Sequence, residues 1–205
     1  MAHKFLDLAF TPHVLAAQQH YFGRSQVLPP APGDDPLGPE EKAFIESRDS
    51  FYLSSVSETG WPYVQHRGGE PGFVKVLGPF ELAFADYKGN RQMLTTGNVT
   101  GNDRVCLFLM DYPRRERLKL LGHAEVLDAR EHPDLVASLA KPEQAKLVER
   151  LFRIRIVSFD WNCPKYITPR FTAEEVQAAI QPMKARITQL EEELAACQGG
   201  QATNS

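Results

Sequence analysis

Short runs rich in β-branched and aromatic residues follow one another through the middle of the chain, with turn residues between them. The run at 104–110 is apolar almost throughout, which is typical of a strand buried on both faces, whereas 153–159 alternates strictly between polar and apolar residues. Short strands with turns about every 8–12 residues favour a barrel or a sandwich, and a barrel also removes exposed strand edges. The expected strands are 51–56, 63–66, 72–77, 81–85, 104–110, 118–126 and 153–159.

Helical patterns precede and interrupt these strands. The sequence predicts a short helix over 12–22, a second over 39–48 that opens on a proline and two glutamates, and a third over 133–151 that Pro142 would break. Residues 27–39 hold five prolines and two glycines, a composition that favours an extended arm.

The last segment carries a heptad pattern. Thr172 and Glu175 have the spacing of a capping box, and apolar residues then recur in steps of four and three over about three repeats. The pattern predicts a helix that pairs with a second copy, although a helix lying on its own barrel would show the same stripe, and Pro182 would strain either one. The apolar positions are Val176, Ile180, Met183, Ile187, Leu190, Leu194 and Cys197.

These patterns divide the chain into four parts. Residues 1–39 form an N-terminal helix and a proline-rich arm, 40–171 a barrel domain, 172–198 the C-terminal helix, and 199–205 a tail that we expect to be disordered. The expected fold is mainly β with peripheral helices.

Composition and charge argue against several kinds of partner. A net charge of −3 and a pI near 6.1 give no basic field for nucleic acid, although the local cluster at 114–117 could hold a small anion or be only a solvated turn. The three cysteines lack zinc-ligand or CxxC spacing, the first ten residues lack a signal peptide's apolar region, and no apolar run approaches the roughly 20 residues of a membrane span. We therefore expect a cytoplasmic protein with no membrane or nucleic-acid partner.

Three clusters carry candidate chemistry. The stretch 84–92 follows a strand and combines two cations with a turn glycine, which suits a phosphate, but 88–90 is also compatible with a simple hairpin turn. The stretch 66–75 has three glycines flanked by Arg67 and Lys75, which would let the backbone approach a ligand closely; a wide turn with solvated charges explains it equally well, and no GxGxxG fingerprint is present.

The third cluster, 160–165, follows the alternating strand. Trp161 could stack on a flat ring and Asn162 could hydrogen-bond a heteroatom, whereas core packing of the tryptophan is the simpler explanation. Cys163 lies close to Lys165 in the sequence, but nucleophilic catalysis there has little support.

The order of these segments resembles the pyridoxamine 5′-phosphate oxidase-like FMN-binding family, and most closely its branch of predicted flavin-nucleotide-binding proteins. The matching patterns cover about two thirds of the chain. They are HRGGxPGFV at 66–74, FADYxGNRQ at 84–92, TGN…NDR at 96–104, LFLMDYPRR at 107–115 and FDWNCPxxI-PRF at 159–171.

The resemblance implies a split β-barrel whose homodimer interface holds two FMN molecules, so that 40–171 would be the FMN-binding domain. By position, Asn90, Arg91 and Gln92 resemble the family's phosphate-binding turn. The strand that borders the flavin would supply Arg67, Phe73, Val74 and Lys75, the strand leading into the turn would supply Ala85 and Asp86, and the second subunit would supply Trp161 and Asn162.

The chain also departs from the family pattern. True pyridoxamine-phosphate oxidases end in an RxHDR-like motif that holds the substrate, and this chain has residues 161–164 followed by a helix instead. The resemblance therefore implies a flavin-dependent oxidoreductase of undefined substrate, with no side chain required as a nucleophile. The alternatives are a non-catalytic flavin-binding or sensing module, or a binder of another planar anionic cofactor such as F420 or haem; none of the six histidines has a distinctive axial-ligand context.

Overall fold

The barrel is built from one antiparallel sheet of seven strands in the order β2-β1-β5-β6-β7-β4-β3. The computed structural model describes residues 3–26, 28–89, 91–161 and 164–202. The strands are β1 (Ser50–Val56), β2 (Pro62–Gly68), β3 (Val74–Gly78), β4 (Glu81–Tyr87), β5 (Arg104–Asp111), β6 (Glu116–Asp128) and β7 (Val148–Trp161). The fold is therefore mainly β, as the sequence predicts.

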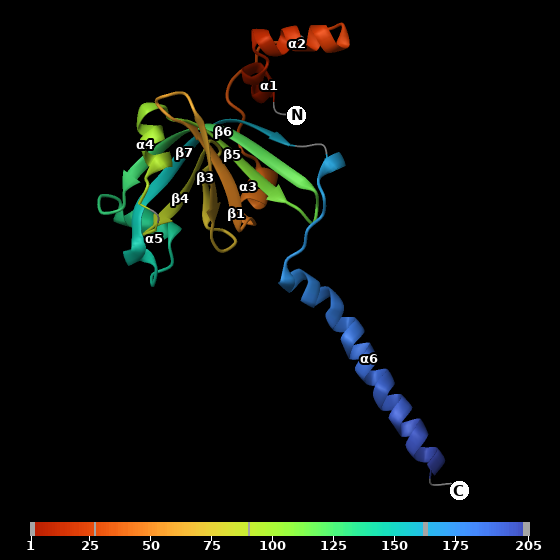
Figure 1. The fold of residues 1–205 in the computed structure, drawn as a ribbon. Helices are drawn as coiled ribbons and strands as arrows, with labels where there is room; N and C mark the ends of the chain where they lie inside the picture. Colours follow the sequence, from red (N-terminus) through yellow and green to blue (C-terminus); the bar gives the residue numbers. More distant parts are fainter. Residues whose placement is uncertain (1–2, 27, 90, 162–163, 203–205) are drawn as a thin grey trace.

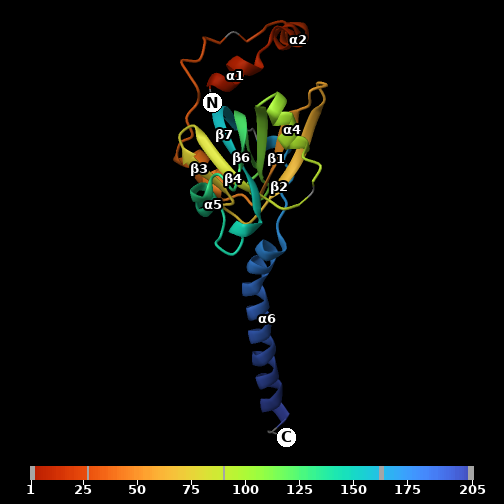
Figure 2. The same cartoon turned by 90° about the vertical axis from the view of Figure 1, so that its left-hand side faces the viewer.

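The connection between β2 and β3 forces this sheet to curl. The two strands form opposite edges of the sheet, yet only residues 69–73 join them. Five residues span at most about 18 Å, so the edges must come close together around a shared interior. Figures 1 and 2 show the sheet wrapped in this way. The result is a split barrel.

Aromatic rings fill the barrel interior. Phe84 of β4 lies opposite Phe152 of β7 in the strand register, and their rings stack at 5.1 Å. Phe51 of β1 meets Phe84 edge-on at 5.3 Å, and all three residues are buried. Such pairs add about 0.5–1.5 kcal/mol each beyond the area that they bury.

A second, smaller core lies on the outer face of β4. Ala83 and Ala85 face away from the barrel interior and pack with Val136 and Leu139 of helix α5 (Pro133–Leu139) and with Leu151 of β7. Because β4 is covered on both sides, four of its consecutive residues are buried.

Two helices begin where the sequence predicts. Helix α2 (Pro12–Phe22) matches the prediction, and α3 (Pro39–Glu46) starts at Pro39. A short helix, α1 (His3–Ala9), precedes α2. Among the described residues, no helix combines the length and apolar character that a membrane span requires.

Two predictions from periodicity were wrong. The predicted helix over 133–151 stops at Leu139; a 3₁₀ turn, η1 (Ala145–Leu147), follows Pro142, and Val148 already begins β7, because residues 148–151 pair with β4. In a single chain, strand β5 is buried on one face: Val105, Leu107 and Leu109 point into the barrel, whereas the residues between them are only half-buried.

The turn after β4 leads to a helix that the sequence did not reveal. Helix α4 (Leu94–Gly101) has the sequence LTTGNVTG, which is rich in threonine and glycine and has low intrinsic helix propensity. Strand β4 pairs with β3 and β7, so the segment after Tyr87 is not a hairpin turn.

The C-terminal helix α6 (Ala173–Ala202) begins at the predicted capping box. The Glu175 N–H donates to Thr172 Oγ1 at 3.1 Å, and the Thr172 N–H donates to Glu175 Oε2 at 2.8 Å. The helix continues past the predicted end at residue 198 and projects away from the barrel (Figure 1). A short 3₁₀ turn, η2 (Pro164–Tyr166), lies between β7 and α6.

Candidate functional site

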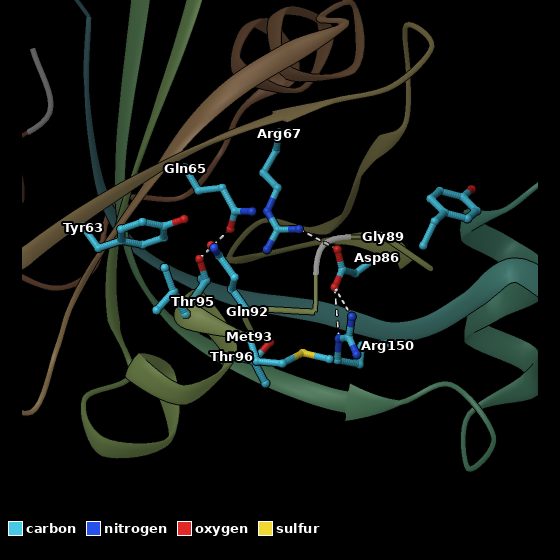
Figure 3. A pocket seen from close by; sticks show the side chains of 12 residues that line it. Tyr63, Gln65, Arg67, Asp86, Gly89, Gln92, Met93, Thr95, Thr96 and Arg150 are labelled. Atoms are coloured by element: carbon cyan, nitrogen blue, oxygen red, sulfur yellow. Dashed lines mark hydrogen bonds and ion pairs between the residues drawn. The ribbon is translucent and has the colours of Figure 1, made fainter.

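A small polar cavity of about 120 Å³ opens where β2, the end of β4 and the start of α4 meet (Figure 3). Strands supply one wall and the first turn of α4 supplies the other. The lining residues are Tyr63, Gln65, Arg67, Asp86, Tyr87, Gly89, Gln92, Met93, Leu94, Thr95, Thr96 and Arg150.

Two arginines share one carboxylate at this cavity. Asp86 lies directly opposite Arg150 in the register of β4 and β7, and Arg150 contacts Asp86 Oδ2 through Nε at 3.0 Å and through a terminal nitrogen at 2.9 Å. Arg67 reaches Asp86 Oδ1 from β2 at 2.5 Å. All three side chains are between 14% and 17% exposed. Arg150 also contacts Glu149 Oε2 at 3.2 Å, so the two guanidinium groups face two carboxylates.

Arg67 keeps an unused donor beside the cavity. Its guanidinium carbon lies 4.9 Å from the centre of the Phe152 ring and 5.8 Å from that of Phe84, so the aromatic core fixes its position. Its Nε is buried and has no hydrogen-bond partner among the described residues. A buried N–H without an acceptor is uncommon in folded proteins, and either a water molecule or a bound anion would satisfy it.

The first turn of α4 adds backbone donors to the same wall. Met93, just before the helix, has a φ of 57°, which is rare for a residue other than glycine, and no side chain caps the helix start. The first-turn N–H groups of an α-helix lack partners within the helix, and its dipole favours an anion at this end. The Thr95 hydroxyl donates to Gln65 Oε1 at 2.7 Å and ties the helix to β2. Together with the two arginines, this arrangement suits a phosphate-sized anion.

Tyr87 lines one end of the cavity. Burial, together with the negative charge of Glu70, raises the pKa of Tyr87 above its ordinary value. The hydroxyl lies 3.4 Å from Gln144 Oε1.

The structure brings together some of the residues that the sequence singles out. Arg67, Asp86 and Gln92 line the cavity, and Arg91 is exposed in the turn that leads to α4. Asn90 and Asn162 lie outside the described residues.

The other candidates lie outside the cavity of a single chain. Phe73 and Val74 pack with the barrel core, Lys75 lies opposite Ala83 in the strand register, and Ala85 belongs to the cluster under α5. Trp161 packs on α3: its ring meets Phe44 at 4.8 Å, and Nε1 donates to Glu41 Oε1 at 2.8 Å.

Sequence reasoning missed Gln65, Thr95 and Arg150. Gln65 and Arg67 are two residues apart on one strand and so share a face, a spacing that could have indicated the glutamine. The sequence did not indicate Arg150 because its segment was predicted to be helical. It did not indicate Thr95 because α4 was not predicted.

A comparison with known protein families identifies the family of this chain. A family model described as pyridoxamine 5′-phosphate oxidase matches residues 37–158. The chain belongs to this family. The matched region of this family member runs from just before α3 into β7 and includes every residue that lines the cavity.

No curated protein matches this family member, but solved structures do. HupZ from Group A Streptococcus is 12% identical, with a TM-score of 0.46 over 60% of this chain and 91% of that one. An FMN-binding protein from Syntrophomonas wolfei is 9% identical, with a TM-score of 0.43 over 60% and 83%. HutZ, a heme storage protein from Vibrio cholerae, is 18% identical, with a TM-score of 0.43 over 59% and 90%.

Proposed function

We propose that this chain binds FMN and acts as a flavin-dependent oxidoreductase on a small molecule. The observation that supports this most directly is a cavity that joins two arginines, an uncapped helix N-terminus and a buried guanidinium nitrogen without an acceptor. When bound, FMN would supply hydride or electron transfer, chemistry that the common side chains do not provide.

The residues of the cavity fit the phosphate end of FMN. Arg67 and Arg150 would hold the phosphate through charge-assisted hydrogen bonds, and the first turn of α4 would add backbone donors. Asp86 would keep the two guanidinium groups oriented, because each already contacts one of its oxygens. Arg91, exposed in the adjoining turn, is our candidate for a further phosphate contact.

A second copy of the chain would complete the site. The cavity of about 120 Å³ is well below the roughly 300–1,000 Å³ of typical ligand pockets, so a single chain encloses only part of FMN. The outer face of the sheet is apolar where β1, β2 and β5 lie side by side: Tyr52 is 41% and Val64 59% exposed, and Phe108 lies opposite Tyr52. We propose that this face forms the homodimer interface, and that the second copy brings Trp161 and Asn162 toward the flavin.

The same observations bear on the alternatives. A deazaflavin such as F420 also carries phosphate and would use the same anion-binding wall. No histidine is found among the described residues that line the cavity, and this counts against haem. The rate at which the loaded protein oxidises reduced nicotinamide distinguishes an oxidoreductase from a non-catalytic flavin carrier. A carrier should oxidise it no faster than free FMN does.

The phosphate assignment is tested by titrating the protein with FMN and with riboflavin, which has the same ring system and no phosphate. Loss of one charge-assisted contact is worth about 1.5–3 kcal/mol, so FMN should bind at least tenfold more tightly than riboflavin. F420 titrated in parallel separates the two phosphate-bearing cofactors. Equal affinity for FMN and riboflavin would remove the cavity from the proposal.

A further inference from the structure

Helix α6 leaves an apolar stripe without a covering surface. Its 30 residues extend away from the barrel in both views (Figures 1 and 2), and the barrel does not bury the stripe. Met183, Ile187 and Leu194 are 65%, 54% and 58% exposed. In water, an amphipathic helix owes most of its stability to packing of its apolar face, so this stripe indicates a missing partner.

The spacing of the stripe identifies the kind of partner. Heptad position a holds Ile180, Ile187 and Leu194. Position d holds Val176, Met183 and Leu190. β-branched residues at a favour two-stranded parallel coiled coils when leucine stands at d, and Leu190 is the leucine among these d positions. Pro182 falls at position c, away from this seam, so its ring does not enter the interface.

The charges beside the stripe are complementary to those of a second copy of the same helix. Lys184 and Arg186 occupy positions e and g of one heptad, and Glu191 and Glu193 occupy the same positions of the next. In a parallel, in-register pair, a g residue meets the e residue five positions later on the other helix, so Arg186 of each copy would face Glu191 of the other. The remaining e and g pairs contain no like charges.

We propose that α6 forms a parallel, in-register coiled coil with α6 of a second copy. An antiparallel pair would also bring Lys184 near Glu191 and Arg186 near Glu193, but it would hold the two barrels at opposite ends of a helix about 45 Å long. The parallel direction rests on the proposed function, in which the same two barrels share the flavin site. The helix pair would then raise the effective concentration of one barrel for the other.

Disulfide trapping tests the pairing and its direction in the full chain. In a background with all three cysteines changed to serine, Ile180→Cys places a thiol in the seam, and Ala178→Cys places one on the opposite, exposed face as a matched control. Mild oxidation should give a covalent dimer of the first variant within minutes and little of the second. No dimer from Ile180→Cys, as an antiparallel pair would give, or equal yields from both variants, would overturn the proposal.

Hydrogen exchange gives a second, independent readout. Backbone amides of residues 176–194 should be protected in the wild-type chain, and Ile187→Asp should abolish that protection while Ala185→Asp, on the exposed face, leaves it unchanged. Rapid exchange of these amides in the wild type, or unchanged protection in Ile187→Asp, would contradict pairing. An FMN titration of the same samples separates the claims: trapping without FMN uptake would leave the coiled coil standing and remove the proposed function.

Discussion

Replacing Arg67 with methionine should weaken FMN binding while leaving the barrel folded. Methionine keeps the aliphatic part of the side chain over Phe152, so the structural losses are the cation–π contact, worth about 0.5–2 kcal/mol, and the ion pair with Asp86. Asp86 retains Arg150 at 2.9–3.0 Å and is not left unpaired. The cavity loses one positive charge and one charge-assisted contact to the phosphate, worth about 1.5–3 kcal/mol, so Kd should rise about 10- to 150-fold.

Equilibrium titration of FMN followed by flavin fluorescence measures this change, with thermal unfolding recorded on the same samples. Arg153→Met is the control: Arg153 lies on β7, pairs with Glu125 at 2.6 Å and faces away from the cavity. The control should bind FMN like the wild type, and riboflavin should bind equally to all three proteins. An unchanged Kd in Arg67→Met, or an equal loss in the control, would refute the role of Arg67.

Three further predictions concern the barrel, its outer face and the start of α4. Gly122→Ala should destabilise the fold by about 1–3 kcal/mol in urea, because a Cβ there would lie 2.5 Å from the Arg155 carbonyl oxygen; an unchanged midpoint would show that the strand can shift at no cost. Burial raises the pKa of the Cys106 thiol, so this thiol should react with a maleimide more slowly than glutathione does at pH 7. A faster reaction would argue that the face of β5 that carries Cys106 is not covered. Thr95→Val should cost about 1 kcal/mol and weaken FMN binding by loosening the start of α4 from Gln65; wild-type affinity would make that hydrogen bond irrelevant to the site.

The strands of the barrel could be predicted because each carries its own signal. Alternation at 153–159 and the apolar run at 104–110 both identify strands, and the runs between Ser50 and Val126 correspond to β1 through β6. Their order in the sheet does not follow from those signals. It depends on pairing between distant segments, such as β4 with β7, and the family resemblance implied only the split barrel.

The site was only partly predictable for related physical reasons. Arg67 and Asp86 stand in recognisable motifs, but Arg150 lies in a segment whose leucines also fit a helical repeat, and pairing with β4 decides its structure. Helix α4 forms from threonine and glycine because tertiary contacts override weak propensity: Thr95 is 2% exposed and bonded to Gln65. No local pattern could therefore place its N-terminus opposite two arginines.

A visible absorption spectrum of the protein, recorded after incubation with FMN and removal of free ligand, shows directly whether the chain holds the flavin. The bands of an oxidised flavin should stay with the wild-type chain and be lost from Arg67→Met at the same concentration. A folded wild-type chain that emerges colourless after FMN incubation would contradict the assignment of the cavity to the flavin phosphate.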